Sequence, residues 1–330
     1  MPAPSSRELC KVFNVSQVTA VHALNYLAQR GFLQHKPGHN YYISRKFDNS
    51  QNNYRFLTML FRHISTGNVE YYGNQIIAGV MREAAVAAVG TYHSHSAAQT
   101  IYAHKTDFSQ TLEEALMLPR QNMGFIADYQ IPDEIIEEIR NATGLPVVVI
   151  GRQSRVPDVR SVVLDVYPGY NFTLKTLKRL GYNAFICCES HMLLHYEGAQ
   201  QHLFFKELSE QEEVIIYPEF TNFVEPRQHE LLRKALRHFT NRRVAILTPD
   251  DTTARKIVNG LENMGFKVPD HVGVVGFYGT RQATDYSPKL CCLSIQPEQI
   301  GKTAVQMLLS KENNNTLNKL PMDFVFGETI

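Results

Sequence analysis

The chain opens with two helical patterns separated by a turn. Residues 7–13 place apolar side chains on one side of a short helix, and Ser5 or Ser6 is positioned to accept a hydrogen bond from the free amides of its first turn. Asn14 ends this helix. Ser16 is placed to cap a second helix, which Gly31 terminates. The pattern therefore predicts a pair of short helices at the start of the chain.

The second helix is predicted to have an apolar side and a polar side. Its apolar positions recur three residues apart and are Val18, Val21, Leu24 and Leu27. Its polar side offers Gln17, Thr19 and His22. After it, residues 32–34 and 41–44 are predicted to form two strands around a turn that contains Pro37 and Gly38. The whole stretch is typical of a helix-turn-helix followed by a small β wing.

Beyond a polar stretch at residues 46–53, short apolar runs alternate with amphipathic helical stretches. The first set has apolar runs at 56–61, 101–103, 124–127 and 147–150, with helices at 74–89, 109–118 and 132–143. A turn-rich stretch at 152–160 follows. The second set has runs at 161–164, 184–188, 214–217, 244–247 and 272–275, with helices at 168–180, 196–208, 226–239 and 252–264. This alternation predicts two successive βα arrays with mainly parallel sheets. A last segment, with elements at 291–295, 297–309 and 322–326, is compatible with either array.

The opening stretch resembles the winged helix-turn-helix of the GntR family of bacterial transcription regulators. The motifs that carry the resemblance are PSSREL at 4–9, NVSQVTAVHALNYLAQRGF at 14–32 and the wing PGHNYYIS at 37–44. The family usually has Arg at the positions of Gln17 and Val21 and a second wing Gly at the position of Asn40. Its first helix would precede Pro4. The resemblance implies a DNA-binding domain, here without its leading helix.

The remainder resembles the effector-binding module of the LacI (lactose repressor) family. The motifs are LPVVVIGR at 145–152, VVLDVYPG at 162–169, PDDTTARKIVNGLENMGFKVPDHVGVVGF at 249–277 and SPKLCCLSIQPEQIGKTAVQMLL at 287–309. A GntR-like head on a LacI-like body resembles the arabinose-repressor type of regulator. The resemblance implies an α/β, two-lobed periplasmic-binding-protein-like type I fold, with parallel sheets flanked by helices, preceded by a small winged helix-turn-helix domain.

These patterns predict three segments of the chain. Residues 1–45 form the DNA-binding domain, 46–53 a linker, and 54–330 an effector-binding and dimerisation domain. Within that domain we expect lobe 1 to comprise about 54–152 plus 296–318, and lobe 2 about 161–290 plus 321–330.

Charge is unevenly distributed although the chain of 330 residues is nearly neutral, at +1. Within residues 1–46 the only acid is Glu8, whereas the bases are Arg7, Lys11, Arg30, Lys36, Arg45 and Lys46. Such a local excess suits contact with a phosphate backbone, although a solvated face would look the same. From this head we expect DNA contacts by Arg7, Ser16, Gln17, Thr19, His22, Lys36 and His39.

Compartment and cysteine usage add further expectations. No apolar run approaches the roughly 20 residues of a membrane span, and the N-terminus lacks the pattern of a signal peptide, so we expect a cytoplasmic protein without membrane contact. The five cysteines fit neither a disulfide framework nor a zinc-ribbon spacing. We therefore expect no metal and no cofactor, with the vicinal pairs Cys187–Cys188 and Cys291–Cys292 buried as small apolar residues.

Candidate effector contacts follow from the rule that parallel α/β sheets bind ligands at the carboxyl ends of their strands. These candidates are Tyr71, Tyr72, Asp128, Arg152, His195, Asp251, Tyr278 and Gln296. Purely structural roles remain alternatives. The tyrosines could pack on the surface, His195 could start a helix, and Asp251 could be an N-cap. Aromatic faces with a few fixed polar groups suit a sugar-like or polyol ligand.

The LacI resemblance changes what the cleft is expected to bind. Sugar-binding members typically have Asp at the positions of Gly151 and Tyr278 and Arg at the position of His195. Asp251 matches a cleft Asp of the family, with Asp250 in place of the usual Asn. Because a His cannot reproduce the bidentate fork of an Arg, we expect an effector other than a hexose bound in the usual way.

Enzyme hypotheses find little support, because phosphate-cradling, dinucleotide-binding, nucleophile-elbow and metalloprotease motifs are all missing from the sequence. We therefore expect no catalytic residues. The sequence predicts a ligand-responsive DNA-binding transcription regulator, a repressor acting as a homodimer on operator DNA. The alternative is a solute-binding sensor module with a vestigial DNA-binding head.

Overall fold

The computed structural model divides into two compact units, Met1–Tyr54 and Arg55–Ile330, which we call the head and the body. It describes residues 3–13, 15–29, 33–35, 41–43, 55–61, 72–102, 107–118, 120–189, 196–217, 226–310 and 316–330. Among these residues, no helix has both the length and the apolar character that crossing a membrane requires.

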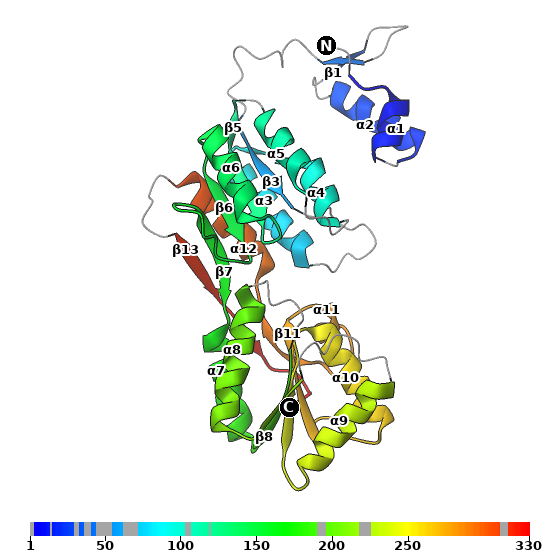
Figure 1. Cartoon of the computed structure of the whole chain (residues 1–330). Coiled ribbons are helices and arrows are strands. Elements are labelled where there is room, and N and C mark those ends of the chain that lie inside the picture. The colour runs from blue at the N-terminus through cyan, green and yellow to red at the C-terminus, as the bar shows by residue number, and fades with distance from the viewer. Residues whose placement is uncertain are drawn as a thin grey trace. The chain divides into compact units, whose positions relative to one another are not determined.

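The head contains two helices and a two-stranded antiparallel ribbon (Figure 1). Its elements are α1 (Ser6–Phe13), α2 (Gln17–Gln29), β1 (Leu33–His35) and β2 (Tyr41–Ile43). Leu33 pairs with Ile43 and His35 with Tyr41 in the ribbon. The predicted helix pair and ribbon are confirmed. The wing residues Lys36 and His39 and the predicted linker lie outside the described residues.

Local side-chain bonds define where the two head helices begin. The Ser5 amide and hydroxyl donate to Glu8 Oε2 at 2.7 and 2.8 Å, and the Glu8 amide donates to Ser5 Oγ at 3.3 Å. This reciprocal capping box satisfies donors that the first turn of α1 leaves free. It also lowers the pKa of Glu8, through the bonds from Ser5. At α2, Ser16 Oγ accepts from the Thr19 amide at 3.1 Å, so the predicted cap is confirmed.

The buried side of α2 differs from the predicted apolar side. Leu24 is buried, but Val18 is 68% exposed and Leu27 is 38% exposed. Residues three apart on an α-helix are separated by about 60° around its axis, so positions 18 and 27 point to opposite sides. The head core is instead formed by Ala3, Leu24 and Leu33. The prediction that Val18 and Leu27 share one apolar side of α2 is therefore wrong.

The first lobe of the body is built on a six-stranded parallel sheet. In spatial order its strands are β13 (Leu317–Pro321), β7 (Arg160–Asp165), β6 (Val147–Ile150), β5 (Asn122–Asp128), β3 (Phe56–Leu60) and β4 (Gly90–His93). One face carries α3 (Tyr72–Val86) and α12 (Pro297–Leu309). The other face carries α4 (His95–Tyr102), α5 (Ser109–Leu116) and α6 (Asp133–Thr143).

Two glycines let α3 and α12 pack without a layer of side chains between them. A Cβ on Gly79 would lie 2.2 Å from the Glu298 carbonyl oxygen, and one on Gly301 would lie 2.1 Å from the Ile76 carbonyl oxygen. Any other residue at either position would force the helices apart. The helix pair is therefore in backbone contact.

The second lobe has a six-stranded sheet that is parallel except for its edge strand β14. In spatial order its strands are β14 (Asp323–Val325), β12 (Cys291–Ser294), β11 (Val272–Tyr278), β10 (Val244–Leu247), β8 (Ala184–Cys188) and β9 (Val214–Tyr217). Cys187, Cys188, Cys291 and Cys292 are buried in these strands, as predicted. Burial raises the pKa of the Cys187 and Cys188 thiols.

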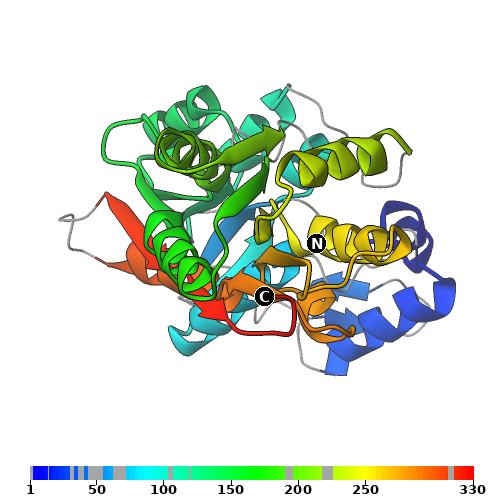
Figure 2. The same cartoon turned by 90° about the horizontal axis from the view of Figure 1, so that it is seen from below.

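Helices cover both faces of the second sheet (Figures 1 and 2). One face carries α7 (Val166–Arg179) and α8 (Tyr196–Gln211), and the other carries α9 (Pro226–His238) and α10 (Asp251–Asn263). The short α11 (Arg281–Thr284) follows β11. On the α7–α8 face, Tyr170 stacks between Phe204 and Phe277, with ring centroids 5.0 and 5.7 Å away. Each lobe is thus a three-layer α/β sandwich.

The chain passes between the two lobes three times. The crossings follow β7, β12 and β13, and one apolar cluster continues through them from Leu57 in the first lobe to Phe277 in the second. The prediction that lobe 2 begins at residue 161 is wrong, because β7 pairs with β6 and β13 in the first sheet. The polar stretch before β7 is a connection inside lobe 1. An apolar run reveals a strand, but it does not reveal the partner strand.

Three other differences concern lobe 1. The predicted strand at 101–103 is wrong, because Ile101 and Tyr102 end helix α4. That helix begins where Ser94 Oγ accepts from the Ala97 amide at 3.1 Å and Glu114 accepts from the His95 and Ser96 amides. A run of three apolar residues does not distinguish a strand from a helix. Strands β4 and β13 were missed, and both are edge strands with partly exposed residues, which weakens their pattern.

Candidate functional site

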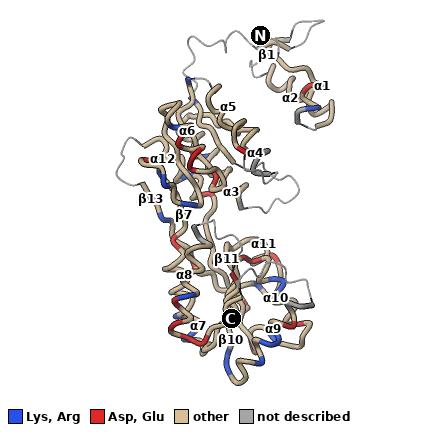
Figure 3. The backbone as a smooth tube through the Cα atoms, viewed as in Figure 1, with Lys and Arg blue, Asp and Glu red and all other residues tan. Residues whose placement is uncertain are grey.

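The candidate DNA-reading surface is the N-terminal half of α2. Gln17, Thr19 and His22 are exposed there, as predicted, and so is Ser16 just before the helix. Arg7 is exposed on α1. No charged residue occurs in α2, so the charges of the described head lie on α1 (Figure 3). The candidate reading helix α2 is thus uncharged, and the described cations of the head lie on α1.

Three of the predicted effector contacts cannot be placed in a site. Tyr71 and His195 lie outside the described residues, and Tyr72 is the first residue of α3 with its side chain likewise outside them. The start of α3 is described from Gly73 onward, and Gln75 lies one turn into the helix. The roles of these three residues stay predictions.

Arg152 holds together the loops at the carboxyl ends of β5 and β6. Its guanidinium donates to the Tyr129 and Ile131 carbonyl oxygens at 2.9 and 2.6 Å and to Asp133 Oδ1 at 2.7 Å. Asp133 also accepts from Ser154 Oγ and from the Arg155 amide. Burial raises the pKa of Asp133, but the bonds from Arg155, Arg152 and Ser154 outweigh burial and lower it. Because its donors are engaged in this network, Arg152 shapes the edge of the sheet.

Asp128 also has a local role at the end of β5. Its Oδ1 accepts from the Gln130 amide at 3.0 Å, and its carbonyl oxygen accepts from the Ile131 amide at 3.0 Å. These bonds form a turn that leads toward α6. An effector role for Asp128 stays a prediction.

Two adjacent acids at the start of α10 have different structural roles. Asp250, rather than Asp251, is the N-cap, and its carboxylate accepts from the Thr253 amide at 2.7 Å and from the Thr253 hydroxyl at 2.9 Å. Asp251 is the first helical residue and is 1% exposed. Its Oδ2 accepts from the Thr280 amide at 2.6 Å, which fastens the loop after β11.

The other oxygen of Asp251 is the least satisfied polar atom of this edge. Oδ1 is buried without a hydrogen-bond partner among the described residues. It occupies space that Gly276 leaves open, because a Cβ there would lie 2.4 Å from it. Burial is the main reason that the pKa of Asp251 rises to about 7, and the Thr280 amide opposes this rise. Asp251 therefore stores unfavourable free energy at the end of β10.

Tyr278 adopts a strained backbone conformation at the end of β11. Its φ is 95°, in a region that residues with a Cβ rarely adopt, and Gly279 follows with φ of 72°. A Cβ on Gly279 would lie 2.3 Å from Ser294 Oγ. The Tyr278 ring packs edge-on against Phe277, with centroids 4.7 Å apart. Such strain commonly accompanies functional sites, which favours Tyr278 as a ligand contact.

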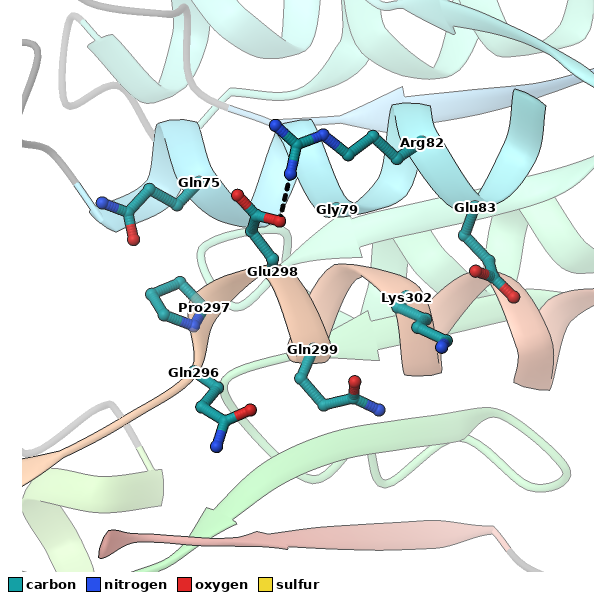
Figure 4. A pocket seen from close by; sticks show the side chains of 9 residues that line it. All are labelled: Gln75, Gly79, Arg82, Glu83, Gln296, Pro297, Glu298, Gln299 and Lys302. Atoms are coloured by element: carbon teal, nitrogen blue, oxygen red, sulfur yellow. Dashed lines mark hydrogen bonds and ion pairs between the residues drawn. The ribbon is translucent and has the colours of Figure 1, made fainter. Parts of the chain in front are cut away.

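Gln296 lines a pocket of about 470 Å³ formed by residues along α3 and at the start of α12 (Figure 4). The other lining residues are Gln75, Gly79, Arg82, Glu83, Pro297, Glu298, Gln299 and Lys302. Figure 4 shows Gln75 and Gln296 at the same end of the two helices, while Arg82 and Glu298 form an ion pair across them. The side-chain amide of Gln296 also donates from Nε2 to Asp323 Oδ2 at 3.3 Å. This bond joins the second crossing of the chain to the third.

Two acids at strand ends were not among the predicted contacts. Glu189 follows β8, is 6% exposed and lies 2.8 Å from His202 Nδ1 on α8. Asp250 follows β10 and is half-buried. The strand-end rule applied to both, but it was used to select His195 and Asp251 instead. In the described part of the chain, no three His, Cys, Asp or Glu side chains gather so that they could hold a metal ion.

Parts of the body are similar in sequence to known proteins. Residues 174–328 match a family model described as a periplasmic binding protein-like domain. The HTH-type transcriptional repressor PurR of Erwinia tasmaniensis is 23% identical over 203 residues, which cover 58% of this chain and 58% of that repressor. The chain thus spans less than two thirds of the length of this relative.

Two solved structures share the architecture. A LacI family transcriptional regulator from Enterococcus faecium with bound ribose has a TM-score of 0.62 at 18% identity, over 83% of this chain and 98% of that chain. The lac repressor dimer bound to operator and the anti-inducer ONPF has a TM-score of 0.65 at 17% identity, over 86% and 96%. The body therefore has the two-lobed, periplasmic-binding-protein-like type I fold.

Proposed function

We propose that the chain is a ligand-responsive transcription regulator, a repressor that binds pseudo-palindromic operator DNA as a homodimer. The observation that carries the proposal is the union, in one chain, of a capped helix pair with a ribbon and a two-lobed α/β body. The relatives reported above are repressors or transcription regulators by name. A ribbon that follows α2 directly supports the proposal that the head is of the GntR winged type.

In this proposal α2 enters the major groove and the ribbon lies along the backbone. Gln17, Thr19 and His22 face the bases, while Arg7 and the wing residues Lys36 and His39 contact phosphates or the minor groove. The exposure of the first three supports this assignment, and so does the excess of basic residues in the head. N-terminal residues of a recognition helix are the ones that reach base edges in helix-turn-helix proteins.

The effector is a small polar molecule, sugar-like or a polyol, bound at the carboxyl ends of the strands. The strained Tyr278, the loop after β11 that Asp251 fastens and the strand-end positions of Asp128 and Arg152 support this placement. Tyr71, Tyr72, His195 and Gln296 complete the proposed contacts. Ribose in the Enterococcus faecium regulator supports the class of ligand. Binding shifts the population between open and closed lobes and thereby changes the spacing of the paired heads.

The homodimer forms through the outer face of α3. Met81 is 47% exposed on that helix, an apolar side chain that a second copy would cover. The lac repressor structure, which shares the fold, is a dimer. Sedimentation of Met81→Glu should show monomers at concentrations where the unaltered chain is dimeric. Met117→Glu, at an 82% exposed position of another surface, is the matched control and should leave the dimer intact. A dimeric Met81→Glu variant would place the interface elsewhere.

The DNA proposal is tested by selecting binding sites from random duplexes with the full chain. Enriched duplexes should bind much more tightly than scrambled ones, and the affinity should fall steeply as salt rises, because bound phosphates release counterions. A small set of sugars and polyols, beginning with ribose, is then added. One of them should raise the melting temperature of the body and change operator affinity, since a ligand stabilises the state that binds it.

The results separate the two hypotheses for the chain. Equal, weak binding to every duplex together with a ligand-induced rise in melting temperature would favour a solute-binding sensor with a vestigial head. Tight, selective DNA binding that no ligand alters would retain the regulator but remove the effector from the proposal. Tyr278→Ala should abolish the thermal shift if Tyr278 contacts the ligand.

A further inference from the structure

Val18 is an exposed apolar side chain on the first turn of α2. It is 68% exposed, whereas Ala3, Leu24 and Leu33 form the apolar cluster of the described head. Its sequence neighbours on the exposed surface are Gln17 and Thr19, and His22 follows one turn later. A polar residue with high helix propensity would stabilise an exposed helical turn more than a β-branched apolar residue does.

The core of the head explains why Val18 points outward. Ala20 and Leu24 are 2% and 3% exposed, and Leu24 packs with Ala3 and Leu33. Val18 lies about 160° around the helix axis from Ala20 and about 120° from Leu24. When Leu24 points into the core of the head, Val18 therefore points toward solvent. No rotation of α2 about its axis would bury both side chains.

Hydrogen bonds at the start of α2 leave Val18 as a free contact surface. The Ser16 and Thr19 hydroxyl oxygens are 2.8 Å apart and bond to each other, and Ser16 Oγ also accepts the Thr19 amide. These two hydroxyls thus define the first turn. The exposed residues beside them are Gln17, Val18 and His22. Helix α2 contains no Lys, Arg, Asp or Glu (Figure 3).

The chemistry of the major groove offers one partner for such a side chain. The edges of the base pairs present hydrogen-bond donors and acceptors, and their one apolar group is the C5-methyl of thymine. The amide of a Gln can pair with adenine, whereas the methyl groups of a Val can only make apolar contact. We propose that Val18 is a specificity-determining residue that contacts the C5-methyl of one thymine in each operator half-site. This inference rests on the proposed function, because it requires α2 to lie in the major groove.

The test uses deoxyuridine, which differs from thymidine only by that methyl group. The full chain first selects an operator from random duplexes, and each thymine is then replaced singly by deoxyuridine. One position per half-site should weaken binding about fourfold, the effect of losing one buried methyl-sized contact. With Val18→Ser the same replacement should change affinity by less than about 1.5-fold, because the apolar partner is gone. Circular dichroism should be unchanged, since Val18 is exposed.

Two control variants make the assignment specific to Val18. Leu27→Ala removes another partly exposed apolar side chain of α2 and should keep the full deoxyuridine effect. Gln17→Ala should lower affinity and relax selectivity at a different base pair, again with the deoxyuridine effect retained. Each deoxyuridine replacement is therefore measured with the unaltered chain and with the three variants. The ratio of thymidine to deoxyuridine affinity is compared among these four proteins.

Two results would overturn the inference, and they differ in what else they overturn. If the unaltered chain selects an operator but no deoxyuridine replacement weakens binding, or if Val18→Ser retains the same loss, then Val18 does not contact a thymine methyl and the regulator stands. If the chain selects no sequence at all, the proposed function fails and this inference fails with it.

Discussion

The head and the body are stabilised in different ways. The apolar cluster of the described head has three buried residues, and its helices start at side-chain bonds between residues three apart in sequence. The body has large apolar clusters that unite strands and helices far apart in the chain. Side chains on the head surface, such as Val18, are therefore free of packing demands, whereas residues at the strand ends of the body are engaged in bonds. Base selectivity can change at little cost to folding, but a change at Asp251 or Arg152 affects the fold.

The largest effect should come from ionisation of Asp251 in the body. The pKa of this carboxyl is about 7 when folded, against 3.8 in a model peptide. A raised acid pKa contributes stability that is complete below about pH 4 and is lost as pH rises through 7. Asp251→Asn should therefore raise the free energy of unfolding at pH 8 by up to about 4 kcal/mol, with the difference vanishing near pH 4. Thermal melts of the body across this range measure it.

Asp133 supplies the control with the opposite sign. Its pKa is lowered when folded, so its contribution is present above its unfolded pKa and is lost as pH falls through the folded value. Asp133→Asn should therefore destabilise the body at neutral pH and lose that effect in acid. Parallel pH profiles for the two variants would contradict this account of the strand ends.

A smaller effect in kcal/mol should have a larger consequence in the head. Leu24→Ala truncates the buried leucine of α2 in the head cluster and should cost about 2–3 kcal/mol. Because so little else holds the head, we expect its amides to lose hydrogen-exchange protection and operator binding to vanish, while the body keeps its melting temperature. Leu57→Ala, at a fully buried position of the large body cluster, is the counterpart and should lower the body transition without unfolding it. Unchanged head protection in Leu24→Ala would refute the comparison.

The smallest effect should come from the cap of α2. Ser16→Ala removes the acceptor for the Thr19 amide and should cost the head about 1 kcal/mol. Hydrogen exchange at the first turn of α2 is the measurement. Ser6→Ala, one residue inside α1, is a matched control and should cost less. Equal losses in both variants would mean that the capping bonds contribute nothing special to the head.

Much of the fold could be predicted because burial leaves a clear pattern in sequence. The runs at β6, β9 and β10 and the helix α12 were placed with their observed bounds, since each is apolar and flanked by turn residues. The lobe of β7 could not be predicted, because both sheets offer equally apolar neighbours and pairing is a long-range choice. The strand proposed at 101–103 was wrong because the contacts of Ser94 and Glu114 that start α4 involve residues far along the chain.

The site was harder to predict than the fold. The strand-end rule found Tyr278 and Asp251, but the backbone strain of the first and the unpaired oxygen of the second depend on Gly279 and Gly276 beside them. Sequence also suggested Arg152 as a ligand contact, whereas its donors bind the loop at 129–133. A side chain's spare hydrogen-bonding capacity is set by tertiary neighbours, which periodicity does not reveal.

The backbone contact between α3 and α12 has a mechanical consequence. Layers of side chains can absorb small displacements by changing rotamers, but the contact at Gly79 and Gly301 contains no such layer. The pair must therefore move as one stiff body. Because α12 begins directly after the crossing from β12, a displacement of that crossing should also move Met81, which lies about 160° around the axis of α3 from Gly79. An event at the strand ends would thus reach the proposed dimer surface as a rigid shift.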